Sequence, residues 1–192
     1  MKIELRRAAM TYQAPDGEVA ALRDATFGVA DGEFVSIVGP SGCGKSTLLA
    51  LIAGIEHPSG GEVLVDGEPV RAPTGKAGLM PQRDQLFDWR TIWGNVTLGL
   101  EVRHENTPAR RELILLKQII RREHKTALLV THDISEAISL SDRIIVLSHR
   151  PATVKAIHDL GALRTVPPLE RRSRPEFQTL FNQIWEELDV NV

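Results

Sequence analysis

The sequence predicts an α/β fold in which a parallel β-sheet is flanked by helices. Apolar segments of strand character alternate with helical segments, and a glycine-rich loop follows one of the strands. Three strand segments, EFVSIVG, TALLVTH and DRIIVLS, are nearly all apolar, as expected for strands covered on both faces. A chain of 192 residues can bury one sizeable core, so we expect a single domain.

Composition and charge narrow the classes of protein to which the chain could belong. A formal net charge of −2 argues against nucleic-acid binding by bulk electrostatics. The longest strongly apolar run, 48–53, is far too short to span a bilayer, and the N-terminus lacks the apolar core of a signal peptide. The single cysteine, Cys43, lies in the glycine-rich loop, so we expect a cytosolic protein whose role at a membrane is peripheral.

The first 72 residues are expected to supply an antiparallel β subdomain and the start of the parallel sheet. KIELRRAAMTY and VAALRDATFGVADG read as two β segments with turn residues between them. EFVSIVG is a buried strand, and the helix after it extends from about Lys45 to Ala53, where Gly54 is placed to end it. GEVLVDGEPV predicts a hairpin with Asp66-Gly67 as its turn.

The later segments continue the alternation of strands and helices. KAGLMPQ predicts a short strand, TIWGNVTLGLEVR has helical character, and residues 110–124 are amphipathic at helical spacing. TALLVTH and DRIIVLS are buried strands, and Asp133 is placed to cap the helix ISEAISL between them. The C-terminal helix starts at Pro175. Its expected apolar face consists of Phe177, Leu180, Phe181, Ile184, Trp185 and Leu188.

The segment VGPSGCGKST, residues 38–47, fits the spacing G-x-x-x-x-G-K-[ST] of a phosphate-binding loop. Glycines let successive backbone N–H groups point at an anion, and the N-terminus of the next helix adds positive partial charge. Lys45 is expected to reach the β- and γ-phosphates, and Ser46 to place its hydroxyl on Mg²⁺. A strand before the loop and a helix after it make a chance glycine-rich turn a weak alternative. We therefore predict a nucleotide-binding site.

Longer segments around this loop resemble the ATP-binding subunit of ABC transporters, over essentially the whole chain. GPSGCGKSTLLALIAGIEHPSGGEVLVDGEPV is similar to the family's phosphate-loop region, and LLVTHDISEAISLSDRIIVLS resembles its switch-histidine segment. LMPQRDQLFDWRTIWGNVTLGLE looks like the nitrate, sulfonate and taurine importer branch. The resemblance implies a P-loop NTPase fold, a RecA-like parallel sheet flanked by helices, with an N-terminal antiparallel β subdomain and, here, a largely missing helical subdomain.

The resemblance also implies roles for individual residues. Tyr12 would stack on adenine, Gln82 would touch Mg²⁺ or the attacking water and couple to the membrane subunit, and His132 would contact the γ-phosphate. Each has a plainer alternative: an edge-strand aromatic, a loop amide, and a strand-end histidine that caps a helix. The loop residues expected to bind ATP are Gly39, Pro40, Ser41, Gly42, Cys43, Gly44, Lys45, Ser46 and Thr47.

Two parts that the resemblance leads us to expect are absent from the sequence: a signature segment of LSGGQ type and a Walker B strand ending in Asp-Glu, whose acid holds Mg²⁺. Only 50 positions separate Gln82 from His132 (132 − 82 = 50). We therefore predict an in-frame deletion of several dozen residues near 108–112. The Asp66 of VLVDG belongs to a hairpin turn, and PSGGE lies before Gln82 with no helix after it. Asp133 could replace the missing Mg²⁺ ligand, but we interpret it as a helix N-cap.

The implied function is the ATP-binding subunit of an importer of a small anion, with ATP and Mg²⁺ as cofactors. An integral-membrane permease subunit and a homodimer or heterodimer are the implied partners, at the inner face of the cell membrane. ATP binding needs only segments that are present, whereas loss of a catalytic base costs ~10²–10⁴-fold in rate. One alternative is a non-hydrolysing remnant that binds nucleotide or docks on a permease. Another is a small P-loop kinase, which would need an Arg-rich lid, or a GTPase, which would need the guanine-reading motif N-K-x-D.

In this fold class the switch strand lies directly beside the phosphate-loop strand, with the Walker B strand on its far side, so TALLVTH should still pair with EFVSIVG. Loss of the Walker B strand should leave the other edge of TALLVTH exposed unless KAGLM pairs with it. The chain is expected to divide into 1–36 and 61–72 (β subdomain), 33–55 (phosphate loop and helix), 78–108 (Q-loop and remnant of the helical subdomain), 110–150 (switch-histidine core) and 151–192 (C-terminal strand and helix).

Overall fold

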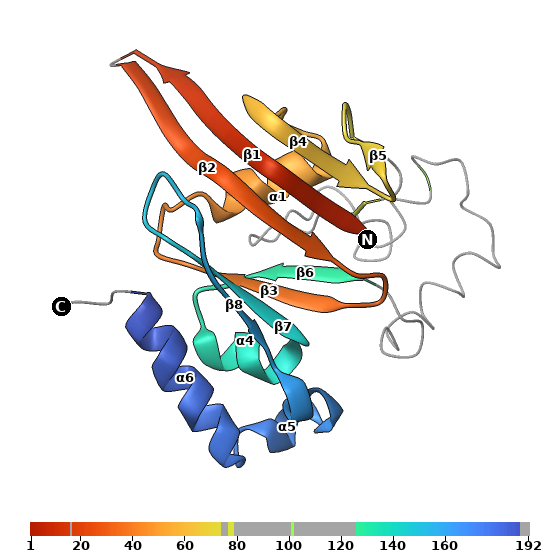
Figure 1. The fold of residues 1–192 in the computed structure, drawn as a ribbon, viewed down its shortest axis with the longest axis vertical. Helices are drawn as coiled ribbons and strands as arrows, with labels where there is room; N and C mark the ends of the chain where they lie inside the picture. Colours follow the sequence, from red (N-terminus) through yellow and green to blue (C-terminus); the bar gives the residue numbers. More distant parts are fainter. Residues whose placement is uncertain (16, 74–76, 79–100, 102–125, 189–192) are drawn as a thin grey trace. The chain divides into compact units, whose positions relative to one another are not determined.

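The computed structural model describes residues 1–15, 17–73, 77–78, 101 and 126–188. The chain divides into two compact units, one of residues 1–78 and 125–192 and the other of residues 79–124. All the elements described below belong to the first unit (Figure 1). The expected strand at KAGLM, the remnant of the helical subdomain and the amphipathic segment 110–124 lie largely or wholly outside the described residues.

An antiparallel sheet forms from the N-terminal third of the chain (Figure 1). Its strands are β1 (Ile3–Ala14), β2 (Gly17–Val29), β4 (Gly60–Val65) and β5 (Glu68–Pro69), in the spatial order β2-β1-β4-β5. β4 and β5 are joined by Asp66-Gly67, and both residues have positive φ, of 55° and 76°. Two consecutive residues with positive φ are what a two-residue hairpin turn of type I′ requires, so the predicted turn is confirmed.

A second, mostly parallel sheet holds the three strands that the sequence predicted as buried. EFVSIVG and DRIIVLS are buried, but residues 127–130 of TALLVTH are only half-buried, so the predicted burial of that strand is wrong. Its strands are β3 (Phe34–Val38), β6 (Ala127–Val130), β7 (Arg143–Leu147) and β8 (Val154–Asp159), in the order β6-β3-β7-β8. β3 pairs in parallel with β6 on one side and with β7 on the other, and β8 runs antiparallel to β7. The prediction that TALLVTH lies directly beside EFVSIVG is therefore confirmed. The carboxyl ends of β3, β6 and β7 meet at one edge of the sheet.

Helices cover both faces of this second sheet. On one face, α1 (Lys45–Ala53) packs with β3 and β7 against the antiparallel sheet, in a core that includes Ile37, Leu48 and Ile145. On the other face lie α4 (Ile134–Leu140), the 3₁₀ helix η2 (Gly161–Thr165), α5 (Pro168–Arg171) and α6 (Pro175–Glu187). Their core includes Val38 and Ile144 of the sheet. The nearly all-apolar composition of β3 and β7 follows from this two-sided cover.

The C-terminal helix differs from its predicted pattern at one position. Phe177 and Ile184 are buried, and Leu180, Phe181 and Leu188 pack at the edge of the core. Trp185, assigned to the same apolar face, is 47% exposed and so lies outside the core. Its ring stacks instead on Phe181, with ring centroids 6.2 Å apart. Stacking covers part of an aromatic surface that the core cannot accept.

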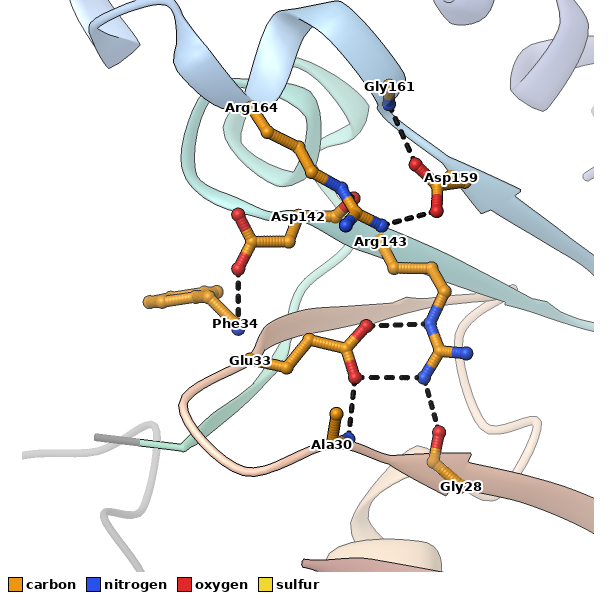
Figure 2. A network of polar contacts seen from close by, with 9 residues as sticks. All are labelled: Gly28, Ala30, Glu33, Phe34, Asp142, Arg143, Asp159, Gly161 and Arg164. Atoms are coloured by element: carbon orange, nitrogen blue, oxygen red, sulfur yellow. Dashed lines mark hydrogen bonds and ion pairs between the residues drawn. The ribbon is translucent and has the colours of Figure 1, made fainter. Parts of the chain in front are cut away.

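A polar network fixes the amino ends of β3 and β7 (Figure 2). Arg143 Nε lies 2.9 Å from Glu33 Oε1, and Arg143 also donates to the carbonyl of Gly28. Glu33 Oε2 accepts the N–H of Ala30 at 2.7 Å. Because the pair is largely buried, with 21% and 12% of the two side chains exposed, it holds the turn before β3 against β7.

Candidate nucleotide site at the carboxyl edge of the sheet

The predicted phosphate loop connects the buried strand β3 to helix α1. β3 ends at Val38, and α1 begins at Lys45 with Gly44 as its N-cap residue. Gly44 has φ of 123°, and a Cβ there would lie 2.8 Å from the carbonyl oxygen of Ala21. No other residue type would fit this position without strain. The strand, the tight loop and the helix therefore occur in the order that the sequence predicted.

Positive charge collects at the mouth of this loop. Lys45 Nζ donates hydrogen bonds to the carbonyl oxygens of Gly39 at 2.7 Å and Pro40 at 2.8 Å, so its ammonium lies across the loop. Gly44 has no side chain to cap the helix, and the first turn of α1 contains no acidic residue. The backbone N–H groups at the start of α1 are thus left for a ligand, and both they and Lys45 favour an anion. The arrangement fits the phosphates of a nucleotide.

Tyr12 reaches the loop from the antiparallel sheet. Its side chain is half-buried at the end of β1, and its hydroxyl donates to Thr47 Oγ1 at 3.3 Å. Thr47 lies in the first turn of α1, directly after Ser46, whose side chain is exposed. The aromatic ring on β1 and the residues of α1 proposed to hold phosphate and Mg²⁺ are therefore neighbours.

His132 comes to the same edge from β6. Val130 is paired with Ile37 of β3, and Thr131 donates its N–H to the Ile37 carbonyl at 3.2 Å. His132 follows at once, just as Gly39 follows Val38 on the neighbouring strand, and its side chain is exposed. Parallel pairing alone thus brings the histidine to the edge that carries the phosphate loop. Gln82, the remaining predicted site residue, lies outside the described residues.

Asp133 and Asp66, the two aspartates considered in place of the missing Walker B acid, each make contacts within the fold. Asp133 is the N-cap of α4, and its Oδ1 accepts the N–H of Glu136 at 3.1 Å. Asp66 occupies the β4–β5 turn and pairs with Lys2 at 2.8 Å, which raises the pKa of Lys2. Among the described residues, no group of three His, Cys, Asp or Glu side chains could together hold a metal ion.

Comparison with known proteins assigns this arrangement to a family. The family model described as ABC transporter matches residues 22–155, which include the loop, α1, β6, His132 and β7. The chain belongs to the ABC transporter family. Its P-loop NTPase fold and its α/β class are those expected from the sequence. ATP-binding domains of this family bind ATP, typically with Mg²⁺, form dimers and associate with the membrane components of a transporter.

Individual relatives agree with this assignment. An ABC transporter ATP-binding protein of Bacillus subtilis is 32% identical, over 93% of this chain and 92% of the relative. An aliphatic sulfonates import ATP-binding protein of Bacillus cereus is 24% identical, over 98% and 96%. The fold is similar to that of the dimeric ATP-binding cassette MJ0796 bound to ADP and Pi, with a TM-score of 0.69 at 22% identity, over 82% of this chain and 98% of that one. Within the described part of the chain, every helix is too short or too polar to cross a membrane.

One feature of the site was not predicted from the sequence. Thr131, Asp133 and Glu136 form a closed set of hydrogen bonds around His132. The signal was present in the sequence, because Asp133 and Glu136 have the N-cap to N3 spacing of a capping box. What the spacing could not indicate is that the hydroxyl of Thr131 joins the set.

Proposed function

We propose that the chain is the ATP-binding subunit of an importer and binds ATP–Mg²⁺ at residues 39–47. Lys45 would contact the β- and γ-phosphates, Ser46 would hold Mg²⁺, Tyr12 would stack on adenine, and His132 would contact the γ-phosphate. The observation that carries the proposal is the convergence of Lys45, the uncapped start of α1 and His132 at one edge of the sheet. These groups favour a polyanion, and such a site at the carboxyl ends of parallel strands is common in α/β proteins.

The proposed partner is an integral-membrane permease, with the chain in the cytoplasm at the inner face of the cell membrane. Gln82 would contact Mg²⁺ or the attacking water and couple the site to that permease. Uptake of a small anion such as nitrate, a sulfonate or taurine is supported by the segment 79–101 and by the sulfonate-import relative. Assembly as a homodimer or a heterodimer is part of the same proposal.

We further propose that an internal deletion removed the signature and the Walker B strand. The alignment with the Bacillus subtilis relative extends over 240 residues, whereas 93% of 192 residues is about 179, so about 61 aligned positions have no counterpart here. For the Bacillus cereus relative, the same calculation gives about 58 aligned positions with no counterpart in this chain. For an ATP-binding protein of Brucella melitensis, which is 32% identical over 96% of this chain and 91% of its own length, it gives about 39. Among the described strands, β6 lies at the edge of the sheet next to β3, and a Walker B strand would pair with its other edge.

The consequence proposed for chemistry is that ATP is bound but hydrolysed close to background. Hydrolysis needs a base and a metal held from both sides, and loss of the base costs ~10²–10⁴-fold. The second candidate is therefore a non-hydrolysing subunit that binds nucleotide or docks on a permease. The role of Asp133 as N-cap favours this second candidate, because its carboxylate already accepts a backbone N–H at the start of α4.

Calorimetric titration with ATP–Mg²⁺ and a phosphate-release assay test both parts. Binding should weaken at least tenfold in Lys45→Ala, because the charge at the loop mouth is lost. Lys155→Ala, a change at an exposed lysine of β8, is the matched control and should bind as the wild type does. Equal affinity in Lys45→Ala would refute the binding site. Turnover that is lost in His132→Ala would refute the proposed loss of hydrolysis.

A further inference from the structure

His132 is flanked by residues whose polar groups are joined to one another. The hydroxyl of Thr131 donates to Glu136 Oε2 at 2.5 Å and accepts the N–H of Asp133 at 3.0 Å. The N–H of Glu136 in turn donates to Asp133 Oδ1 at 3.1 Å. We call these three side chains, Thr131, Asp133 and Glu136, the switch bracket. A hydroxyl can donate one hydrogen bond and accept others, so Thr131 fills both roles within the bracket.

The switch bracket does more than an ordinary helix cap needs. In a capping box, the N3 carboxylate bonds directly to the N-cap N–H, and no residue before the N-cap takes part. Here the hydroxyl of Thr131 stands between Glu136 and the N–H of Asp133. The bracket therefore includes the residue on each side of His132 but not His132 itself, whose side chain is exposed. The His132 side chain is therefore left available for a ligand.

The bracket is also fixed to the rest of the fold. Thr131 is buried, 8% exposed, and its N–H bonds to Ile37 of the strand that leads into the phosphate loop. At the other end of α4, Arg171 donates to the carbonyls of Ile138 at 3.0 Å and Ser141 at 2.6 Å. A helix of seven residues is too short to be stable alone, so these contacts at its two ends hold it in place. The backbone of His132 is thereby fixed relative to the loop.

We propose that Thr131 and Glu136 are positioning residues that hold the backbone of His132 at the place from which its side chain contacts the γ-phosphate of bound ATP. This inference rests on the proposed function, in which His132 contacts that phosphate. A residue whose backbone is already held in its bound position loses less conformational freedom when the ligand binds, so its contact contributes more affinity. The bracket should therefore act on the preference for ATP over ADP, which differ by the phosphate that His132 would contact, and not on nucleotide affinity in general.

The test measures dissociation constants for ATP–Mg²⁺ and ADP–Mg²⁺ in the full chain. Thr131→Val removes the hydroxyl at constant size, Glu136→Ala removes the acceptor, and Thr131→Ser restores the hydroxyl. The first two should lower the preference for ATP about threefold to tenfold, the usual range for one hydrogen bond, and leave ADP affinity unchanged. Thr131→Ser should stay within about twofold of the wild type. Ser135→Ala, in the same turn but outside the bracket, is the matched control and should change nothing.

The same variants are then combined with His132→Ala. Once the histidine is gone there is nothing to position, so Thr131→Val should cause no further loss. If His132→Ala alone leaves the ATP preference intact, the role of His132 fails, and the positioning proposal fails with it. If His132→Ala lowers the preference but Thr131→Val and Glu136→Ala do not, only the positioning proposal is wrong.

Two further outcomes separate positioning from simple stability. An equal loss of ATP and ADP affinity in Thr131→Val would show a general structural role and overturn the proposal. Circular dichroism checks whether each variant folds. If Thr131→Val does not fold, Glu136→Ala decides the test, because Glu136 is only half-buried and alanine favours a helix.

Discussion

The two edges of the parallel sheet use their charged side chains differently. At the amino edge, Arg143 pairs with Glu33 and Asp142 accepts the N–H of Phe34 at 2.9 Å, and each pair joins residues more than a hundred positions apart (Figure 2). At the carboxyl edge, the described partners of the Lys45 ammonium are two carbonyl oxygens and the Cys43 thiol, all in its own loop and within six residues. Charged groups that pair with residues far away in the sequence stabilise the fold. An ammonium group that bonds only within its own loop can exchange those bonds for a ligand at little cost.

The largest effect on stability is expected from breaking the pair at the amino edge. Arg143→Ala would leave the largely buried carboxylate of Glu33 without its cation, which should lower the free energy of unfolding by about 2–3 kcal/mol. Urea denaturation measures this change. The ATP affinity of the folded protein should not change, because the pair lies at the opposite edge from the loop. A loss of affinity at constant stability would contradict the comparison.

Gly44→Ala, at the carboxyl edge, is expected to lower stability less than Arg143→Ala does but to cause a large loss of ATP binding. The new Cβ would approach the carbonyl of Ala21 to 2.8 Å at a φ of 123°, and such strain costs about 1–3 kcal/mol. Gly42→Ala is the control: its φ is also positive, at 72°, but no atom lies within 4 Å of the new Cβ. Thermal melting should rank the two variants in that order. Equal melting temperatures would contradict the steric argument.

Asp133 gives an intermediate effect that also decides between its two interpretations. Asp133→Ala removes the N-cap of α4 and should cost about 1 kcal/mol of stability, whereas Asp133→Asn keeps an acceptor and should cost less. As a cap, the residue has no part in metal binding, so Asp133→Asn should leave the Mg²⁺ dependence of ATP binding unchanged. Loss of that dependence would identify Asp133 as the substitute metal ligand.

The smallest effect is expected on the exposed face of the antiparallel sheet. Hydrogen bonding to Arg6 lowers the pKa of Glu4 below its ordinary 4.5. A lowered pKa means that the carboxylate stabilises the fold above pH 4.5 and that this contribution is lost as the pH falls through the pKa of the folded state. Glu4→Gln should therefore lower the melting temperature slightly at pH 7 and not at pH 3. Added salt should remove the difference, since exposed pairs are screened.

The features that the sequence predicted are those set by local pattern. The apolar run before residue 39 and the glycine spacing indicated β3, the loop and the start of α1. The Asp66-Gly67 turn and the Asp133 cap were predictable because each depends on residues only a few positions apart. The pairing of β3 with β6 was also predicted, though not from local pattern: the family resemblance places the switch strand directly beside the phosphate-loop strand.

What the sequence did not predict depends on residues far apart in the chain. Glu33 and Arg143 are separated by 110 positions, and neither carries a local signal of its partner. Arg171 is 4% exposed, although arginine is almost never fully buried, and it donates to backbone carbonyls of α4. The exposure of Trp185 was also not predicted, because helical periodicity indicates which face is apolar but not how wide a face the core can cover.

The direct pairing of β3 with β6 has a consequence for chain entropy. Val38 ends one strand and Ala127 begins the other, so the pair closes a loop of 88 residues in the unfolded chain. Closure entropy grows only with the logarithm of loop length, and about 60 more residues would change it by roughly 0.5 kcal/mol. The two strands that bring the phosphate loop and His132 together can therefore find each other at nearly the same cost whether the segment between them is long or short.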